Sequence, residues 1–336
     1  MRRYRDVARL LDTSQQAITM IASTHRLTWK TLLAFAIIYF IWGSTYLAIR
    51  VGVREFPPFL MAALRFIVAG AVLFAWAAAR REQSPNQRQW AAISLLAILF
   101  FVLDYGLVFW AETRVPSGIT AVMMALIPAF IALSEITLLR TQTLSLRLAL
   151  ALLAGIAGVA VLASRSSFVG GPPVNSAGAL ALIVASFSWA VGTVLMRKLS
   201  LPTSKVMSSG TQMFVGGIFL AVASAALGEF RDFHPAAISR TAWFSLLYLI
   251  VAGSIIAFTA YLWLIHHESP TKVGTYAYVN PVVAVFLGYF LAGESLGLRT
   301  ILGTLLVLTS VVAITTARAD KKSAPLPAEN AANPAD

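Results

Sequence analysis

Residues 40–50 of the chain read FIWGSTYLAIR, and residues 187–197 read FSWAVGTVLMR. Phenylalanine, tryptophan and arginine stand in the same three places of both stretches. The matching triplets are Phe40, Trp42 and Arg50 in the first and Phe187, Trp189 and Arg197 in the second. Further matches follow in the same order: Val68, Gly70 and Leu73 with Val215, Gly217 and Leu220; Trp110 and Pro128 with Trp263 and Pro281; Leu144, Leu146 and Arg147 with Leu296, Leu298 and Arg299. The chain therefore repeats itself over most of its length.

The composition places both copies in a membrane. Hydrophobic residues make up 58% of the 336 residues, charged residues make up 12%, and the mean hydropathy is +0.78. An ordinary soluble domain carries about 25% charged residues, whereas a helix that crosses a bilayer needs about 20 mostly apolar residues. Ten apolar runs approach this length, at 31–52, 57–79, 89–111, 116–139, 145–164, 177–196, 206–228, 241–265, 271–292 and 299–317. The sequence therefore predicts an all-α integral membrane protein with ten transmembrane helices.

The number of crossings determines how the two copies are related. Each copy contains five expected helices, and after an odd number of crossings the second copy must enter from the opposite face. We therefore expect two inverted five-helix repeats, at 31–164 and 177–317, joined by a linker at 165–176. Inverted repeats are typical of secondary transporters, whose substrate site lies between the repeats near the middle of the bilayer.

The charged residues predict the orientation and the nature of both ends. The chain has 26 Lys and Arg residues, and the positive-inside rule favours a cytoplasmic location for both termini. Residues 1–30 are then a cytoplasmic extension, and 318–336 are expected to be a disordered cytoplasmic tail. The sequence leaves open whether the residues before Met20 are translated. Membrane insertion also explains the pI near 10.4, so no nucleic-acid partner is expected.

Arg65 and Asp104 are the clearest charges at membrane depth, where a charge is costly. At 1.5 Å per residue, each lies about 12 Å from the outer surface, on consecutive helices. Two interpretations remain open. The residues either form a static ion pair or face the cavity, where Arg65 attracts a carboxylate and Asp104 attracts an ammonium group or a proton. Asp104 is the candidate for proton coupling.

Other candidates for the substrate cavity lie near the middle of helices. Trp42 and Trp189 stand too far from the helix ends for interfacial anchors, and small polar residues follow them. The expected helix at 271–292 adds aromatic rings and an amide, which suit a substrate with an apolar body and a polar head. The predicted cavity set is Trp42, Ser44, Thr45, Arg65, Asp104, Trp189, Thr193, Tyr276, Tyr278 and Asn280.

Pro128 and Pro281 occupy matching places in the expected helices at 116–139 and 271–292, where each removes a backbone donor. We expect both to act as hinges, although proline kinks also occur as plain structure. Glu112 and Glu135 are expected in the membrane interface, near the ends of their helices. The absence of cysteine excludes thiolate metal sites, and neither a metal nor a cofactor is predicted.

Several of these stretches resemble the bacterial EamA transporters of the drug/metabolite transporter superfamily. They are Ile41 to Tyr46, Pro57 to Phe66, Val115 to Gly118, and Ser269 to Ala284. The likeness covers roughly residues 31–317 in matching order, although Gly293-Glu294-Ser295-Leu296 has only Thr141-Gln142-Thr143-Leu144 as its counterpart. The resemblance implies a ten-helix carrier of the bacterial inner membrane that works by alternating access and often exports amino acids or related metabolites.

The sequence favours a transporter over other function classes. It has no phosphate-binding loop of an ATP-driven pump and no clustered catalytic motif, so an enzyme is not expected. We expect a secondary transporter that exports amino acids or similar metabolites, with a small-molecule substrate, membrane lipid around it, and homodimer formation left open. The alternatives are transport of another small organic solute, drug-like or sugar-derived and in either direction, and a non-transporting scaffold or sensor.

Overall fold

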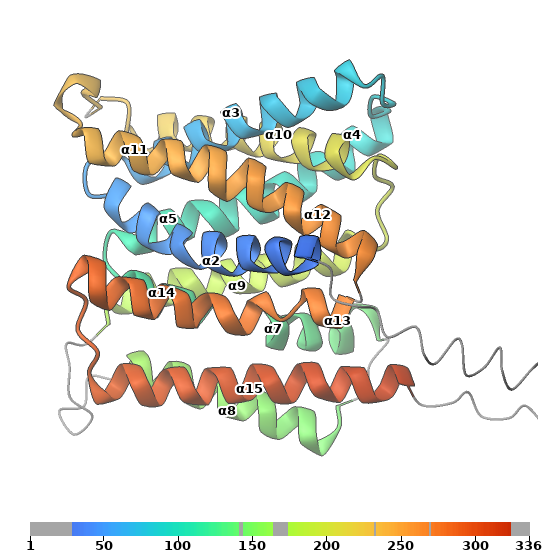
Figure 1. Ribbon diagram of the computed structural model, residues 1–336, viewed down its shortest axis with the longest axis vertical. Coiled ribbons are helices and arrows are strands. Elements are labelled where there is room, and N and C mark those ends of the chain that lie inside the picture. Colours follow the sequence, from blue (N-terminus) through green and yellow to red (C-terminus); the bar gives the residue numbers. More distant parts are fainter. Residues whose placement is uncertain (1–28, 141–143, 164–173, 232, 269, 324–336) are drawn as a thin grey trace, which may run out of the picture.

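The computed structural model describes residues 29–140, 144–163, 174–231, 233–268 and 270–323, and it contains helices but no strand in those ranges. The helices lie side by side and stack along the long axis of the molecule (Figure 1). The pair α8 and α15 forms one edge of the stack, and α3, α4 and α10 form the opposite edge. In chain order the first repeat contains α2 (Trp29–Gly52), α3 (Pro58–Ala79), α4 (Gln87–Ala97), η1 (Ile98–Gly106), α5 (Leu107–Glu112), α6 (Ser117–Met124), α7 (Ile127–Ser134), η2 (Glu135–Leu139) and α8 (Leu146–Ala163).

The second repeat follows the same order. Its elements are α9 (Ser176–Leu195), α10 (Lys205–Ala226), η4 (Pro235–Ala237), α11 (Arg240–Tyr248), η5 (Leu249–Ile256), α12 (Ala257–His267), α13 (Pro270–Val273), α14 (Tyr276–Ala292) and α15 (Leu298–Ser323). η1, η2 and η5 are π-helical, whereas η4 is a 3₁₀ turn. A π-helical segment thus interrupts the third long helix of each repeat.

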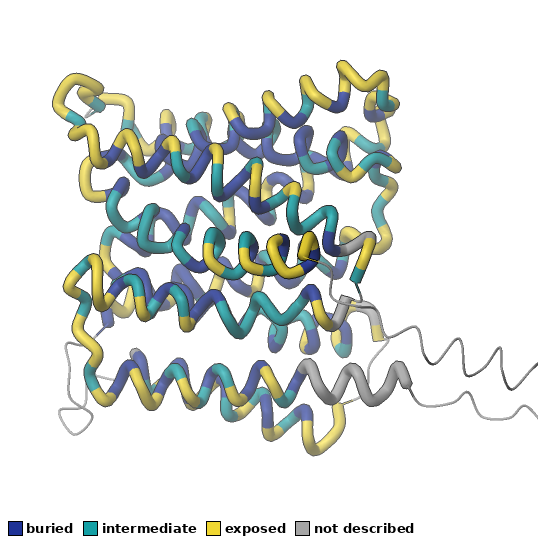
Figure 2. The backbone as a smooth tube through the Cα atoms, in the orientation of Figure 1, coloured by how far each residue is buried: buried dark blue, intermediate teal, exposed yellow. Residues whose placement is uncertain are grey.

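The described residues confirm the all-helical class, and seven of their helices are long and apolar enough to cross a membrane. They are Trp29–Gly52, Pro58–Ala79, Gln87–Glu112, Ser117–Leu138, Ser176–Leu195, Lys205–Ala226 and Arg240–Leu264. Three shorter apolar helices, Leu146–Leu162, Tyr276–Ala292 and Leu298–Ile314, lie at the three remaining predicted segments. Large apolar residues, among them Leu153, Ile156 and Phe290, are exposed, and exposed positions recur along the helices of the stack (Figure 2). Such a surface suits lipid better than water.

The C-terminal helix extends further than the sequence predicts. The tail from residue 318 was expected to be disordered, but α15 continues to Ser323. Several of its last residues, such as Ala319, Lys321 and Lys322, are good helix formers, and neither glycine nor proline occurs between Gly303 and Pro325, so nothing stops the helix earlier. The extension at 1–28 and most of the linker, at 164–173, lie outside the described residues, whereas the second repeat begins at Ser176, after the N-cap Asn175.

The α3 and α10 helices run antiparallel and form the most extensive helix pair. The amides of Phe59 and Leu60, at the start of α3, donate to Glu229, which follows the end of α10. At the opposite end, the Ser204 hydroxyl that caps α10 donates to Glu82, which follows α3. Along the helix axes the molecule therefore has two opposite ends, where the helices begin and finish. We call them the Glu55 end, after the residue between α2 and α3 on the same side as Glu229, and the Glu82 end.

Glycines allow α3 and α10 to cross at close range. A Cβ on Gly70 would lie 2.3 Å from the main-chain nitrogen of Phe214, and one on Gly217 would lie 2.6 Å from that of Ile67. Gly70 and Gly217 are matching residues of the two repeats, so the crossing uses the same glycine from each. Backbone-to-backbone packing of this kind is typical of membrane helices.

The α8–α15 pair shows the same close packing at glycines, at the edge of the stack opposite α3 and α10 (Figure 1). A Cβ on Gly155 would lie 2.8 Å from the Ser310 hydroxyl, and one on Gly303 would lie 2.5 Å from Leu162. The Ser310 hydroxyl also donates to the Ala151 carbonyl at 2.6 Å. Small residues therefore hold both of these helix pairs together.

The Glu55 end is closed by carboxylates that cap helices. The Ser239 amide and hydroxyl, at the start of α11, donate to the Glu55 carboxylate at 2.6 and 2.7 Å. These hydrogen bonds lower the pKa of Glu55 from 4.5, because they stabilise the charged form. In the same way, the Ser117 amide and hydroxyl and the Gly118 amide donate to Glu294. Each of these contacts joins one repeat to the other.

Candidate substrate site

Trp42 lies at the centre of α2 and contacts the second repeat. Its indole nitrogen donates to the Gly253 carbonyl of η5 at 3.1 Å. Its ring lies 5.3 Å from Tyr261 and packs edge-on against Tyr276 at 5.1 Å. These contacts make Trp42 the anchor of an aromatic cluster contributed by α2, α12 and α14.

Trp189, in the second repeat, makes the corresponding contacts with the first repeat. Its ring lies 4.8 Å from Phe100 and 5.9 Å from Tyr105, both in η1. The preceding residue, Ser188, donates its hydroxyl to the Leu99 carbonyl at 2.8 Å. Each tryptophan therefore packs against the π-helical segment of the other repeat. Such segments are frequent at functional sites because they disturb the regular backbone bonding of a helix.

Arg65 connects the two π-helical segments. Its Nε donates to the Ser254 hydroxyl of η5 at 2.9 Å, and its guanidinium carbon lies 5.2 Å from the ring centre of Tyr105 in η1. The side chain is buried, and its Nη1 has no hydrogen-bond partner among the described residues. Gly253 makes room for it, because a Cβ there would lie 3.3 Å from Arg65 Nη2 and 3.0 Å from the Thr45 methyl group.

Asp104 is buried in η1, next to Tyr105. No ion pair with Arg65 occurs in the described part of the chain, so the static pair that the sequence allowed is wrong. The expectation assumed regular α-helical winding, whereas η1 turns more slowly per residue and directs side chains elsewhere. One carboxylate oxygen of Asp104, Oδ1, lacks a hydrogen-bond partner among the described residues. A buried donor and a buried acid thus both retain bonding capacity in this region.

Three predicted hydroxyls bond within the described structure. Ser44 donates to the Ile41 carbonyl at 2.8 Å and lies 2.6 Å from the Tyr248 hydroxyl. Thr45 and Thr193 donate to the carbonyls of Trp42 and Trp189, at 2.6 and 2.8 Å. The two threonines therefore bond to the main chain beside the matched tryptophans.

The three predicted residues of α14, Tyr276, Tyr278 and Asn280, contact different helices. Tyr276 packs on Trp42, as described above. The Asn280 side-chain amide lies 3.2 Å from the main-chain oxygens of Tyr39 and Tyr276. Both neighbours are acceptors, so we assign the amide nitrogen to this position, where it donates to both and links α14 to α2. Tyr278 instead directs its hydroxyl to the Val311 carbonyl of α15 at 3.4 Å. The structure therefore brings Tyr276 to Trp42 but turns Tyr278 toward a different helix.

The predicted hinges lie beside helix breaks. Pro128 stands in the first turn of α7, after a two-residue turn that separates α6 from α7, so it follows an interruption and is not a kink in a continuous helix. Pro281 lies inside α14, and the break in that helix comes earlier, between α13 and Tyr276. The fourth helix of each repeat is therefore broken, but only in the first repeat does the break adjoin the predicted hinge.

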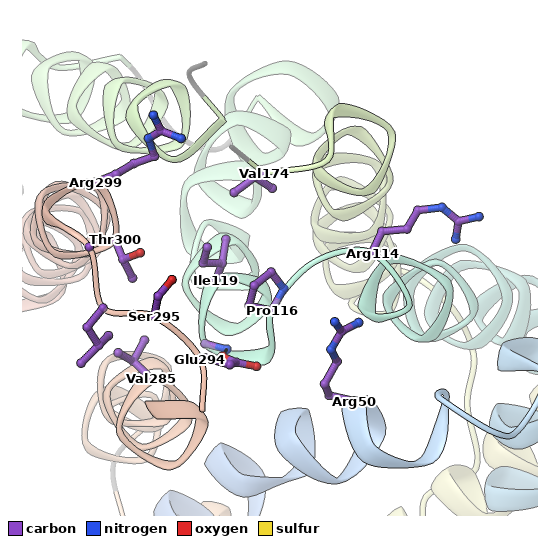
Figure 3. A pocket seen from close by; sticks show the side chains of 13 residues that line it. Arg50, Arg114, Pro116, Ile119, Val174, Val285, Glu294, Ser295, Arg299 and Thr300 are labelled. Atoms are coloured by element: carbon purple, nitrogen blue, oxygen red, sulfur yellow. Dashed lines mark hydrogen bonds between the residues drawn. The ribbon is translucent and has the colours of Figure 1, made fainter. Parts of the chain in front are cut away.

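A cavity of about 200 Å³ lies at the Glu55 end, away from the tryptophans. Arg50, Arg114, Ile119 and Glu294 are among its lining residues, and none of the predicted cavity set lines it (Figure 3). Arg50 projects from α2 toward the centre of this view, where the Glu294 side chain lies beside Pro116 (Figure 3). Little in the amino-acid pattern indicates this cavity, because its lining residues come from helix ends far apart in the chain.

The central region contains contacts that the sequence analysis missed. Tyr105, Gly253 and Ser254 join Arg65 to the two tryptophans, but none of them was predicted. Gly253-Ser254 does interrupt an otherwise apolar run, and such a small polar pair at membrane depth could have drawn attention. Aromatic rings beside a buried guanidinium and a buried carboxyl can bind an apolar body that carries opposite charges.

Comparison with known proteins gives a consistent result. The chain matches the EamA-like transporter family over residues 29–164 and 176–316. An uncharacterized inner membrane transporter of Escherichia coli K12, YedA, is 37% identical over 280 residues, which cover 83% of this chain and 88% of YedA. An uncharacterized transporter of Bacillus subtilis, YvbV, is 25% identical over 297 residues, 88% of this chain and 94% of YvbV.

A solved crystal structure of a protein that is 21% identical covers 88% of this chain and 99% of its own, with a TM-score of 0.57, so it shares the fold. The family match includes both repeats, and the residues that resembled EamA transporters lie within it. With YedA above 30% identity and covered over most of its length, the protein belongs to the EamA-like transporter family.

Proposed function

We propose that the protein is a secondary transporter of the bacterial inner membrane, with ten crossings arranged as two inverted repeats that open alternately. The antiparallel α3–α10 pair supports this proposal, because α3 and α10 are matching helices of the two repeats. Matching helices that point in opposite directions are what an inverted repeat requires.

The packing of the first helices supports the same proposal. α2 packs against η5, α12 and α14 of the second repeat, and α9 packs against η1, α5 and α7 of the first. Exchange of the two repeats therefore reproduces the pattern of contacts. In such an arrangement, a movement that opens one end of the stack closes the other, which is the basis of alternating access.

The substrate is a small zwitterion, such as an amino acid or a related metabolite. The observation that carries this assignment is the pair of buried groups with unused bonding capacity, Arg65 Nη1 and Asp104 Oδ1, beside aromatic rings. A carboxylate would bind Arg65 and an ammonium group would bind Asp104, because buried charges need partners. When no substrate is bound, a proton on Asp104 would neutralise it, so this residue is the candidate for coupling export to the proton gradient.

The Glu55 end faces the periplasm in this proposal, and both termini lie in the cytoplasm. The positive-inside rule supports this orientation. Substrate would enter from the Glu82 end, bind near Trp42 and Trp189, and leave after the capping contacts at the Glu55 end separate.

Growth assays can find the substrate class. A strain that overproduces the protein should resist toxic amino acids or their analogues that the transporter exports. Trp42→Ala and Tyr276→Ala should lower this resistance at least tenfold more than they lower the amount of membrane-inserted protein. Trp76→Ala is the matched control, because that tryptophan is exposed on the outward side of α3. Equal resistance in all three variants would contradict the site.

Accessibility of introduced cysteines tests the cavity directly, because the chain has no native cysteine. Ser44→Cys and Thr193→Cys should react with a small water-soluble thiol reagent, and the amino acid identified by growth should protect them. Reaction only with a reagent dissolved in the lipid would place both residues outside the cavity. Flux of that labelled amino acid into vesicles then separates a transporter from a scaffold or sensor, which gives none.

A further inference from the structure

Glu112, the last residue of α5, is fully buried, although the sequence predicted it in the membrane interface. Neither oxygen of its carboxylate has a hydrogen-bond partner among the described residues. An ionised carboxylate in such a place loses its hydration and gains nothing in return, so the buried group is expected to be neutral.

The charged groups around Glu112 do not compensate for its burial. Arg50 of α2 donates to the main-chain carbonyl of Glu112. Its positive charge favours an ionised carboxylate, but it forms no ion pair with that carboxylate in the described part of the chain. The carboxylate of Glu294, which also lies close enough to act on Glu112, has the same sign. Four other elements pack on α5. Of these, α6 and α9 contribute no ionisable side chain, and η1 contributes Asp104 and Tyr105. The fourth, α3, contributes Arg65, which lies against Phe109. On α2, Tyr46 also lies close enough to act on Glu112.

The fold itself does not require an acid at this position. The matching residue of the second repeat, counted from the pair Trp110 and Trp263, is Ile265. The same helix of the other repeat thus carries an apolar residue there. A buried acid that packing does not need, in only one repeat, indicates a role at one end of the molecule alone.

Glu112 lies beside the cavity of the Glu55 end. Arg50, which is bonded to its main chain, lines that cavity, together with Arg114 and Ile119 (Figure 3). Glu294 holds the start of α6 at the same place through the Ser117 amide, at 2.7 Å. Separation of these contacts would join the cavity to the space around the Glu112 carboxylate and would hydrate it.

We propose that Glu112 binds a proton when the Glu55 end closes and releases it to water when this end opens. On closure, a proton moves from water to a carboxylate oxygen of Glu112 and makes it neutral; on opening, the same O–H bond breaks and the proton returns to water. Acid therefore favours the closed Glu55 end, and a higher pH favours the open one. In the proposed transport cycle, on which this inference builds, Glu112 would link the closure of the periplasmic end to proton binding.

The accessibility of the cavity wall tests this linkage without any substrate. Ile119→Cys places a thiol on a buried residue that lines the cavity, and a membrane-impermeant maleimide can reach it from the Glu55 end only when that end opens. Phe230→Cys, at an exposed site in the turn after α10, corrects for the titration of the thiol itself. The corrected rate should rise up to about tenfold per pH unit below its midpoint, as the release of one proton requires.

Substitutions of Glu112 test whether the proton responsible for this pH response is the one bound to its carboxylate. In the Ile119→Cys background, Glu112→Gln should give a slow rate that does not respond to pH. Glu112→Asp should keep the response and move its midpoint, which preserves the test if the glutamine variant does not fold. Glu229→Gln is the control, because this carboxylate of the same end already accepts bonds from Leu60 and Ser224, and the response should persist.

A corrected rate that is independent of pH in the parent protein would overturn the proposal. So would a response that survives Glu112→Gln, or a midpoint that Glu112→Asp leaves unchanged. Since the assay contains no substrate, failure to find transport would leave these results intact. Conversely, transport that persists while Glu112 shows no linkage would refute this inference alone.

Discussion

Gly70→Ala would test the crossing of α3 and α10, on which the inverted arrangement depends. The added methyl group would lie 2.3 Å from the Phe214 nitrogen, 2.7 Å from its Cα and 2.9 Å from the Gly210 carbonyl oxygen. All three obstacles are main-chain atoms, so no side-chain rotation can relieve the clash. The two helices must therefore separate.

The structure gives the size of this separation. Ordinary van der Waals contact of a Cβ begins at 3.4 Å, so the nearest atom must move by 1.1 Å, the difference between 3.4 and 2.3 Å. A gap of about 0.5–1 Å already removes a quarter to a half of the dispersion energy of the atoms on either side. Overpacking of this kind costs about 1–3 kcal/mol, and we expect Gly70→Ala to fall in the upper half of that range.

The matching substitution, Gly217→Ala, should cost a similar amount, because its Cβ would lie 2.6 Å from the Ile67 nitrogen. The double variant should lose less than the sum of the two, since the first methyl group already separates the helices. The free energy of unfolding can be measured by titration with dodecyl sulfate in mixed micelles. Val68→Leu is the control, because it adds one methylene at an exposed position on the same helix. A Gly70→Ala protein as stable as the wild type would refute the close crossing.

Three further predictions concern other parts of the molecule. Ser254→Ala should lower stability by about 1.5–3 kcal/mol, because it leaves the Nε of buried Arg65 without its partner; micelle unfolding measures this, and no loss would contradict the hydrogen bond. The pKa of Glu55 is lowered in the folded state, so its contribution is present at neutral pH and is lost as the pH falls through that lowered value. Glu55→Gln should thus flatten the acid side of a plot of Tm against pH, and an unchanged plot would contradict the contact. Reporter fusions in the loops at 80–88 and 229–240 should report opposite sides of the membrane, and reporters on the same side would end the inverted-repeat proposal.

The candidate site was only partly predictable. Trp42, Trp189 and Arg65 were identified because aromatic and charged residues at mid-helix are unusual in an apolar segment. The structure brings them together through Tyr105 and Ser254, which no pattern in the sequence had selected. Tyr278 was chosen on the same grounds as Tyr276, yet it faces α15, because neighbouring residues of a helix point in different directions.

The sequence by itself determined the membrane class, the duplication and the membership in a transporter family. Hydropathy and internal repetition are properties of the linear chain, so no contact has to be known before they can be read. Only the tertiary structure decided that Arg65 bonds to Ser254 and not to Asp104, and that Glu112 is buried beside a cavity. The physical reason is that π-helical winding changes the direction in which side chains point, and close glycine crossings change how deeply helix ends are buried. The winding and the crossings in turn depend on how segments distant in the chain pack together.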